Sequence, residues 1–124
     1  MKAFGNLIYS PETATGEAIA KVETHTPKIE APEKVKSNET FEVKVIVGPH
    51  PNTIEHHVKR VELYFYEEGR PFNPILLANI ELTPMYTEPI LKVTLRLKKS
   101  GILYALAYCN LHGLWETRKE VKVG

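Results

Sequence analysis

The 124-residue chain has the length of one domain, and 43% of its residues are hydrophobic, which is enough for a modest core. Its formal net charge of +1 excludes the strongly basic surface that binds nucleic acid or anionic membranes. No apolar run has the length of a membrane span, the first residues lack the features of a secretory signal, and a lone cysteine excludes an internal disulfide. We therefore expect one cytoplasmic domain at residues 1–124, with no nucleic-acid or membrane partner.

The N-terminal region shows no sustained hydrophobic period, and only Glu17–Val22 are compatible with a turn of helix. We expect residues 1–22 to form a loop-rich N-terminal arm. Further along the chain the dominant period is two. Apolar and polar residues alternate in 41–47, 60–65 and 91–98, which is typical of strands that bury one face and expose the other.

The run at residues 102–108 is nearly all apolar, which predicts a central strand covered on both faces. Lys99–Gly101 are few enough to form a hairpin turn between the strand at 91–98 and this central strand. Glycine and proline separate the other runs. The pattern as a whole predicts an all-β fold, an antiparallel β-sandwich of about seven or eight strands.

The five histidines lie in predicted loops or at strand ends, at His25, His50, His56, His57 and His112. A single loop histidine is more often a solvated side chain than a ligand, and a lone buried cysteine is usually a small hydrophobe. The joint pattern points to a metal, because Cys109 and His112 are spaced so that sulfur and imidazole can reach one ion. His56 and His57 are adjacent and point to opposite sides of an extended chain, so at most one of them is a ligand.

The donor set indicates which metals fit. Structural zinc prefers thiolate-rich sites, whereas several imidazoles with one thiolate suit iron or copper better. A blue-copper β-sandwich uses one cysteine, two histidines and a weak axial methionine. The only methionines are Met1 and Met85, and neither follows His112. A mononuclear copper electron-transfer protein therefore stays as the alternative, and a metal-free binding module would leave the histidine placement unexplained.

Two motifs, HPNTIEHH (residues 50–57) and LKKSGILYALAYCNLHGLWE (residues 97–116), resemble the one-iron superoxide reductases, or neelaredoxins, which are related to the iron-site domain of desulfoferrodoxins. The resemblance runs from about residue 23 to the C-terminus. It implies an immunoglobulin-like sandwich and an enzyme that reduces superoxide to hydrogen peroxide by one electron at a mononuclear non-haem iron. It also implies one iron per chain, cycling between Fe²⁺ and Fe³⁺, with re-reduction by rubredoxin or a similar donor, and a homotetramer.

The resemblance also assigns roles to individual residues. Carried over position by position, the equatorial ligands are His25, His50, His56 and His112, the axial ligand is Cys109, and His57 is not a ligand. No bound organic cofactor is implied.

Three residues before the first histidine ligand complete the expected site. In the family, a glutamate at the position of Glu23 closes the sixth coordination position of the ferric form, and in an extended backbone Glu23 would point to the same side as His25. The family lysine that steers superoxide is replaced here by Thr24. We hypothesise that Lys21 partly supplies the missing positive charge.

Overall fold

The computed structural model describes residues 1–124, with three short helical segments followed by eight strands. The helical segments are η1 (Phe4–Leu7), η2 (Gly16–Lys21) and α1 (Val22–His25). The strands are β1 (Pro27–Glu30), β2 (Lys34–Val35), β3 (Phe41–Val47), β4 (Val58–Glu67), β5 (Ile75–Glu81), β6 (Ile90–Leu95), β7 (Gly101–Cys109) and β8 (Gly113–Val123). None of the helices is long and apolar enough to cross a membrane.

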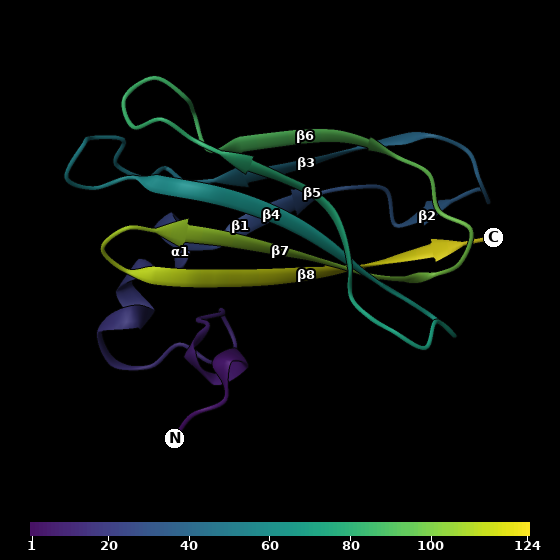
Figure 1. Ribbon diagram of the computed structural model, residues 1–124, viewed down its shortest axis with the longest axis horizontal. Helices are drawn as coiled ribbons and strands as arrows, with labels where there is room; N and C mark the ends of the chain where they lie inside the picture. Colours follow the sequence, from purple (N-terminus) through teal and green to yellow (C-terminus); the bar gives the residue numbers. More distant parts are fainter.

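The strands form two sheets that lie face to face (Figure 1), in the orders β1-β3-β6 and β2-β8-β7-β4-β5. All pairs are antiparallel except the two-residue pairing of β2 with the end of β8, which is parallel. The predicted all-β sandwich and its number of strands are confirmed.

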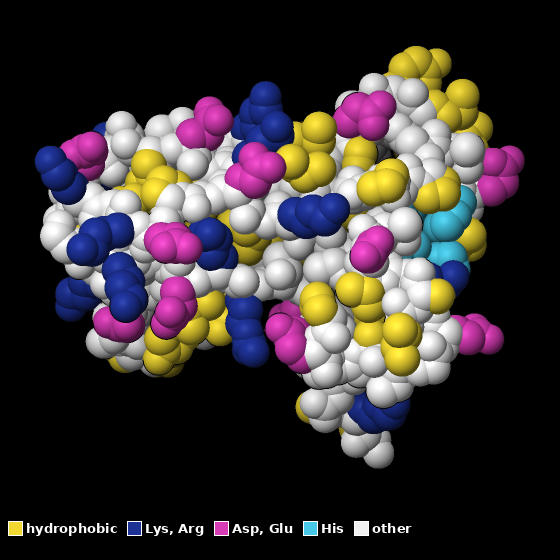
Figure 2. All heavy atoms as spheres, turned by 180° about the vertical axis from the view of Figure 1, so that it is seen from behind, with side chains coloured by type: hydrophobic (Ala, Val, Ile, Leu, Met, Phe, Trp, Pro, Cys, Tyr) yellow, Lys and Arg dark blue, Asp and Glu magenta, His cyan; other side chains and the backbone are white.

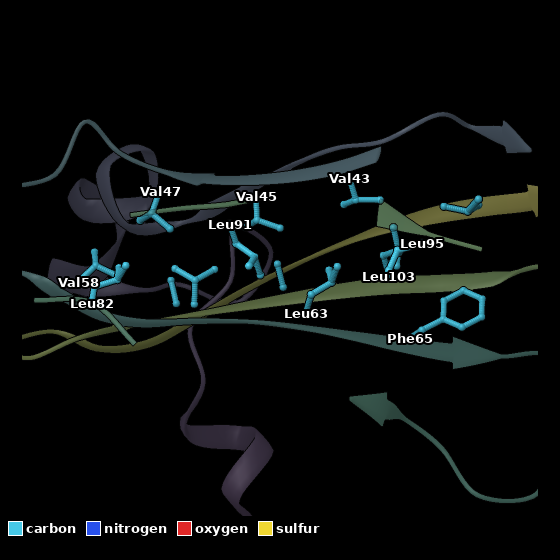
Figure 3. Packing of buried hydrophobic residues seen from close by; sticks show 14 of the residues in the cluster. Val43, Val45, Val47, Val58, Leu63, Phe65, Leu82, Leu91, Leu95 and Leu103 are labelled. Carbon is cyan, nitrogen blue, oxygen red and sulfur yellow. The ribbon is translucent and has the colours of Figure 1, made fainter. Parts of the chain in front are cut away.

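The core lies between the sheets, as the period of two predicts. Val43 and Val45 of β3 point at Leu63 of β4 and Leu103 of β7 (Figure 3), and all four side chains are fully buried. Burial of this kind contributes about 1.5–3 kcal/mol for each aliphatic side chain. The inward row of β7 continues to its last residue, Cys109, so the strand period itself directs the thiol into the interior.

The structure corrects two expectations about residues 91–108. The predicted hairpin at Lys99–Gly101 is wrong, because β6 belongs to the three-stranded sheet and β7 to the five-stranded sheet, so this connection crosses the sandwich. Both strands bury their apolar faces across the core instead of pairing at their edges. β7 is central, but its outer face is only half covered, since buried and half-buried residues alternate along it.

The N-terminal arm is loop-rich apart from its short helical turns, and it is attached to the sandwich. The backbone of Tyr9 accepts a hydrogen bond from the Glu116 N–H (2.8 Å) and donates one to the Leu114 carbonyl (2.9 Å). The Tyr9 ring packs on the buried Trp115, with 4.9 Å between ring centroids. The arm thereby extends the sheet beside β8 at the end of the molecule that carries the histidines.

Candidate metal centre

The predicted ligands converge at one end of the sandwich. In Figure 1, helix α1, the β3–β4 connection and the β7–β8 hairpin all lie at the end opposite the C-terminus. Figure 2 shows the histidine side chains gathered there at the molecular surface. Three segments that are distant in the sequence therefore supply one site from the end of a rigid scaffold.

The β7–β8 hairpin carries two of the candidate ligands. Cys109 is the last residue of β7, and its thiol is free and buried. The three-residue turn at 110–112 is followed by Gly113 at φ +79°, a conformation that favours glycine. This turn brings the His112 Nδ1 to 3.8 Å from the Cys109 Sγ. The Trp115 indole N–H donates to the His112 carbonyl at 3.0 Å and fixes the turn.

The β3–β4 connection carries two more. The His56 N–H donates to the Thr53 hydroxyl (3.0 Å) and the Thr53 N–H donates to the His56 carbonyl (2.9 Å), which closes a tight turn under the ring. The His57 ring lies away from the site, with its Nδ1 at 3.0 Å from the Thr53 carbonyl. The His50 Nδ1–H donates to the Pro51 carbonyl at 2.6 Å, which leaves its Nε2 as the free nitrogen.

Helix α1 carries His25, which is 4% exposed. Its Nδ1 lies 3.2 Å from the Lys21 carbonyl and 2.7 Å from the Thr24 hydroxyl. A carbonyl can only accept, so Nδ1 carries the proton and Nε2 is the free nitrogen. That Nε2 lies 3.1 Å from the His112 Nδ1.

The four imidazoles form a closed ring around one point. Neighbouring ring centroids are 4.5 Å apart for His25 and His50, 4.7 Å for His50 and His56, 4.9 Å for His56 and His112, and 5.0 Å for His112 and His25. Each neighbouring pair meets edge to face, at interplanar angles of 72–77°. His25 and His56 lie across the ring at 6.0 Å. The four rings would thus surround an ion bound between them.

The ligand atoms are close enough for one ion. One atom each from His25, His50, His56 and Cys109 lie within 4.8 Å of one another. His112 is outside that closest group, but its Nδ1 lies near both the His25 nitrogen and the sulfur, as given above. The fold therefore brings all five predicted ligand side chains to one place. Three imidazoles offer Nε2 there, and His112 offers Nδ1.

The polar atoms of this site fit a metal. The Nε2 atoms of His50 and His56 are buried and have no hydrogen-bond partner. An unpaired buried polar atom costs about 1–3 kcal/mol, and native proteins rarely leave two in one place. A cation bound by their lone pairs supplies the missing partner. One thiolate with several imidazoles is a donor set that suits iron.

The electrostatics keep the imidazoles in the neutral form that binds a metal. Burial, together with the neighbouring His50 and His112, lowers the pKa of His25 from 6.5 to about 4. Burial also lowers the pKa of His50, and burial with the nearby charge of Lys21 lowers the pKa of His112. Neutral histidine has a lone pair to donate, so these rings are prepared for coordination near pH 7.

The three residues before His25 lie as follows. Glu23 is exposed and belongs to helix α1, so the expectation that it shares a side with His25 through an extended backbone is wrong. Residues two apart in a helix point in nearly opposite directions. The Thr24 hydroxyl faces the His25 ring, and Lys21 lines the same surface cavity of about 520 Å³ as His112.

Two asparagines brace the ligand loops, a role that was not predicted for either of them: Asn110 joins the two loops to each other, and Asn52 joins one of them to the β5–β6 connection. The Asn110 side chain accepts from the His57 N–H (2.9 Å) and donates to the Glu55 carbonyl (3.0 Å), joining the two ligand loops. Asn52 accepts from the Met85 N–H (2.8 Å) and donates to the Thr87 carbonyl (3.2 Å). Their positions inside the two ligand motifs were the only available signal.

The sequence of this chain is similar to those of a known protein family. The sequence model of the family described as Desulfoferrodoxin matches residues 17–118. The superoxide reductase of Pyrococcus furiosus is 45% identical over 111 residues, which cover 77% of this chain and 86% of that protein. The neelaredoxin of Megalodesulfovibrio gigas is 36% identical, with 82% and 88% covered.

A solved structure is also similar over nearly the whole chain. The superoxide reductase (neelaredoxin) from Ignicoccus hospitalis is 64% identical, covers 99% of this chain and 100% of that one, and superposes with a TM-score of 0.93. Structures of its E23A and T24K variants give TM-scores of 0.98 and 0.94. These variant names indicate that the other protein has glutamate and threonine at the positions of Glu23 and Thr24.

Proposed function

The chain belongs to the desulfoferrodoxin family, and from the ring of four imidazoles beside a buried thiol we propose that it is a superoxide reductase with one mononuclear non-haem iron. The observation that carries the proposal is the pair of buried, unpartnered Nε2 atoms on His50 and His56, to which a bound cation would supply a partner. The relatives named superoxide reductase support an oxidoreductase that acts on superoxide.

The proposed reaction is a one-electron reduction. Superoxide takes up one electron and two protons and leaves as hydrogen peroxide. Bound iron would supply that electron by passing from Fe²⁺ to Fe³⁺, with the thiolate raising its electron density. An external donor would then have to reduce the iron again to Fe²⁺. The lone cysteine of the chain has no partner with which to form a redox-active disulfide.

The residues of the site have different proposed roles. His25, His50, His56 and His112 would hold the ion in their plane, and Cys109 would hold it from the interior. The buried position of the thiol keeps water from the sulfur, while the imidazoles reach the surface (Figure 2), so a small anion can approach from the outer side. Glu23 stands at the surface, and we propose that it reaches the sixth position of the ferric form only if its side chain swings around α1.

Steering of the anion is the role proposed for Lys21. Its charge is close enough to lower the pKa of His112, and Thr24 offers no charge in its place. A cation near an exposed site raises the encounter rate of an anion in a salt-dependent way. We expect Lys21→Ala to slow superoxide consumption about two- to threefold at low ionic strength, with the difference vanishing at high salt. Equal rates and equal salt dependence would exclude this role, and Lys122→Ala at the opposite end is the control.

Three further properties belong to the proposal. The electron donor is rubredoxin or a similar small one-electron carrier, the protein acts in the cytoplasm, and the chains form a homotetramer. Each can be checked separately, by reduction of the ferric form with reduced rubredoxin, by fractionation of the cells, and by light scattering.

The copper alternative lacks its usual axial methionine ligand in this chain. Met85 is 59% exposed, and Met1 is at the exposed N-terminus. A ring of four imidazoles also exceeds the two that such a copper site uses. Iron is therefore the better supported metal.

The deciding experiment combines metal analysis with product analysis. Protein purified without added metal is expected to contain one iron per chain and, with a donor, to convert superoxide to peroxide without releasing oxygen. Cys109→Ser is expected to lose the thiolate-to-iron absorption band and at least about 100-fold in rate. Copper at the same stoichiometry, or oxygen released as a dismutase releases it, would refute the proposal.

A further inference from the structure

We propose that the Thr24 hydroxyl is a positioning residue for the iron ligand His25, an inference that rests on the proposed iron site. Thr24 occupies the position at which the family usually has a lysine. Thr24 is half-buried, and its hydroxyl lies 2.7 Å from the His25 Nδ1. The question is what this contact does.

The direction of the hydrogen bonds can be worked out from the three atoms involved. The Thr24 hydroxyl donates its only proton to the Lys21 carbonyl at 3.2 Å. Its lone pairs are then free to accept the proton on the His25 Nδ1, which also lies 3.2 Å from the same carbonyl. The Thr24 hydroxyl, the His25 Nδ1 and the Lys21 carbonyl thus form a hydrogen-bonded triangle in which Nδ1–H is a donor.

This triangle determines which nitrogen of His25 faces the metal. With the proton fixed on Nδ1, the Nε2 lone pair points toward His112 and the other ligands. A hydrogen bond from Nδ1–H also raises the basicity of Nε2 and fixes the plane of the ring. The Thr24 hydroxyl is nearer to Nδ1 (2.7 Å) than the Lys21 carbonyl is (3.2 Å). The hydroxyl therefore contributes more than the carbonyl to the basicity of Nε2 and to the orientation of the ring.

A lysine at this position cannot do the same. An ammonium group has three donors and no acceptor, so it cannot take the proton of Nδ1. Replacing Thr24 by lysine therefore changes two things at once, because it adds a charge and removes an acceptor. Of two other replacements, Thr24→Val removes the hydroxyl and keeps the shape, while Thr24→Ser keeps the hydroxyl.

The neighbouring Thr26 provides a matched control. Its hydroxyl is also adjacent to His25 in sequence, and it is buried without any hydrogen-bond partner. Thr26→Val thus removes a hydroxyl that no group uses. If a hydroxyl matters only through packing, Thr24→Val and Thr26→Val should have similar effects.

The first measurement is the tautomer of His25 in the metal-free protein, read from long-range ¹⁵N NMR of the imidazole. We expect the Nδ1–H form to dominate in the parent, in Thr24→Ser and in Thr26→Val, and to lose population in Thr24→Val and Thr24→Lys. This readout needs neither iron nor activity, so it stays informative even if the proposed function fails.

The second measurement is iron retention against a competing chelator. We expect the dissociation constant to rise about three- to tenfold in Thr24→Val and Thr24→Lys and to stay within about twofold in Thr24→Ser. The reduction potential should rise in the same two variants, because a less basic imidazole stabilises Fe³⁺ less. Thr24→Ala serves as a second hydroxyl-free variant should the valine variant fail to fold.

Two results would overturn the proposal. Thr24→Val with the tautomer and iron affinity of the parent would mean that the Lys21 carbonyl alone positions His25. Equal losses in Thr24→Ser and Thr24→Val would mean that packing of the γ-methyl group, and not the hydrogen bond, is responsible.

Discussion

The core between the sheets and the loop end that carries the histidines differ in how much each single residue matters for their structure. In the core, fifteen buried apolar side chains share one cluster, and each has several neighbours of the same kind. At the loop end, single hydrogen bonds hold individual positions: the Lys21 carbonyl accepts one from His25, the Thr53 hydroxyl one from the His56 N–H, and Asn110 one from the neighbouring His57 N–H. Core substitutions should therefore change stability first, whereas loop substitutions should change the metal site first.

The largest expected effect separates two adjacent histidines. His56→Ala should remove an equatorial ligand and reduce iron per chain to well under half, since the remaining imidazoles no longer close the ring. His57→Ala removes a ring whose hydrogen bond goes to the Thr53 carbonyl and not to the site, so it should keep full iron content. Metal analysis of both variants, purified side by side, tests the contrast. Equal iron contents would contradict the assignment of ligands.

The core counterpart is Leu63→Ala, in the middle of β4. Its side chain is fully buried, so the substitution should lower the free energy of unfolding by about 2–5 kcal/mol. Iron per folded chain should stay unchanged, because no ligand is carried by the centre of the strand. Denaturant unfolding and metal analysis of the soluble fraction measure both quantities. A loss of iron without a loss of stability would contradict the expectation that core substitutions change stability first.

The smallest effect is expected at Asn110, which joins the two ligand loops. Asn110→Ala removes two exposed hydrogen bonds and should cost about 1 kcal/mol of stability. Iron should nevertheless dissociate several-fold faster, since only the backbone hydrogen bond from the Asn110 N–H to the His57 carbonyl (3.1 Å) then joins the His56 loop to the β7–β8 turn. Asn79→Ala, an exposed asparagine of β5 without a side-chain hydrogen bond, is the control. Identical dissociation rates in the two variants would show that the loops hold their positions without this contact.

The same contrast explains what could be predicted from the sequence. A period of two predicted the strands at 41–47, 60–65 and 91–98, because burial of one sheet face imposes that period directly, whereas the nearly all-apolar run at 102–108 concealed the alternation that ends at Cys109. It could not show that β6 and β7 belong to different sheets, since both kinds of connection leave the same pattern. The helical turn at Glu23 also escaped, because α1 has only four residues and no capping side chain.

At the metal centre, the motifs predicted the ligand set, and the structure brings those five side chains together. The supporting contacts were harder to foresee. Asn110 and the Thr24 hydroxyl act through distances of a few ångströms to the His57 N–H and the His25 Nδ1, which depend on the exact paths of two loops. Residue type alone does not report such distances.

The spread of the ligands along the chain affects the order in which the protein matures. His25 and His112 are 87 positions apart, yet their nitrogens meet at 3.1 Å. During synthesis the first histidine therefore emerges long before the hairpin that must meet it, and a chain that stops short of the end of β7 lacks Cys109 and His112. A tightly held iron ion would consequently indicate that synthesis and folding are complete. Partly made chains would have little capacity to retain a redox-active metal.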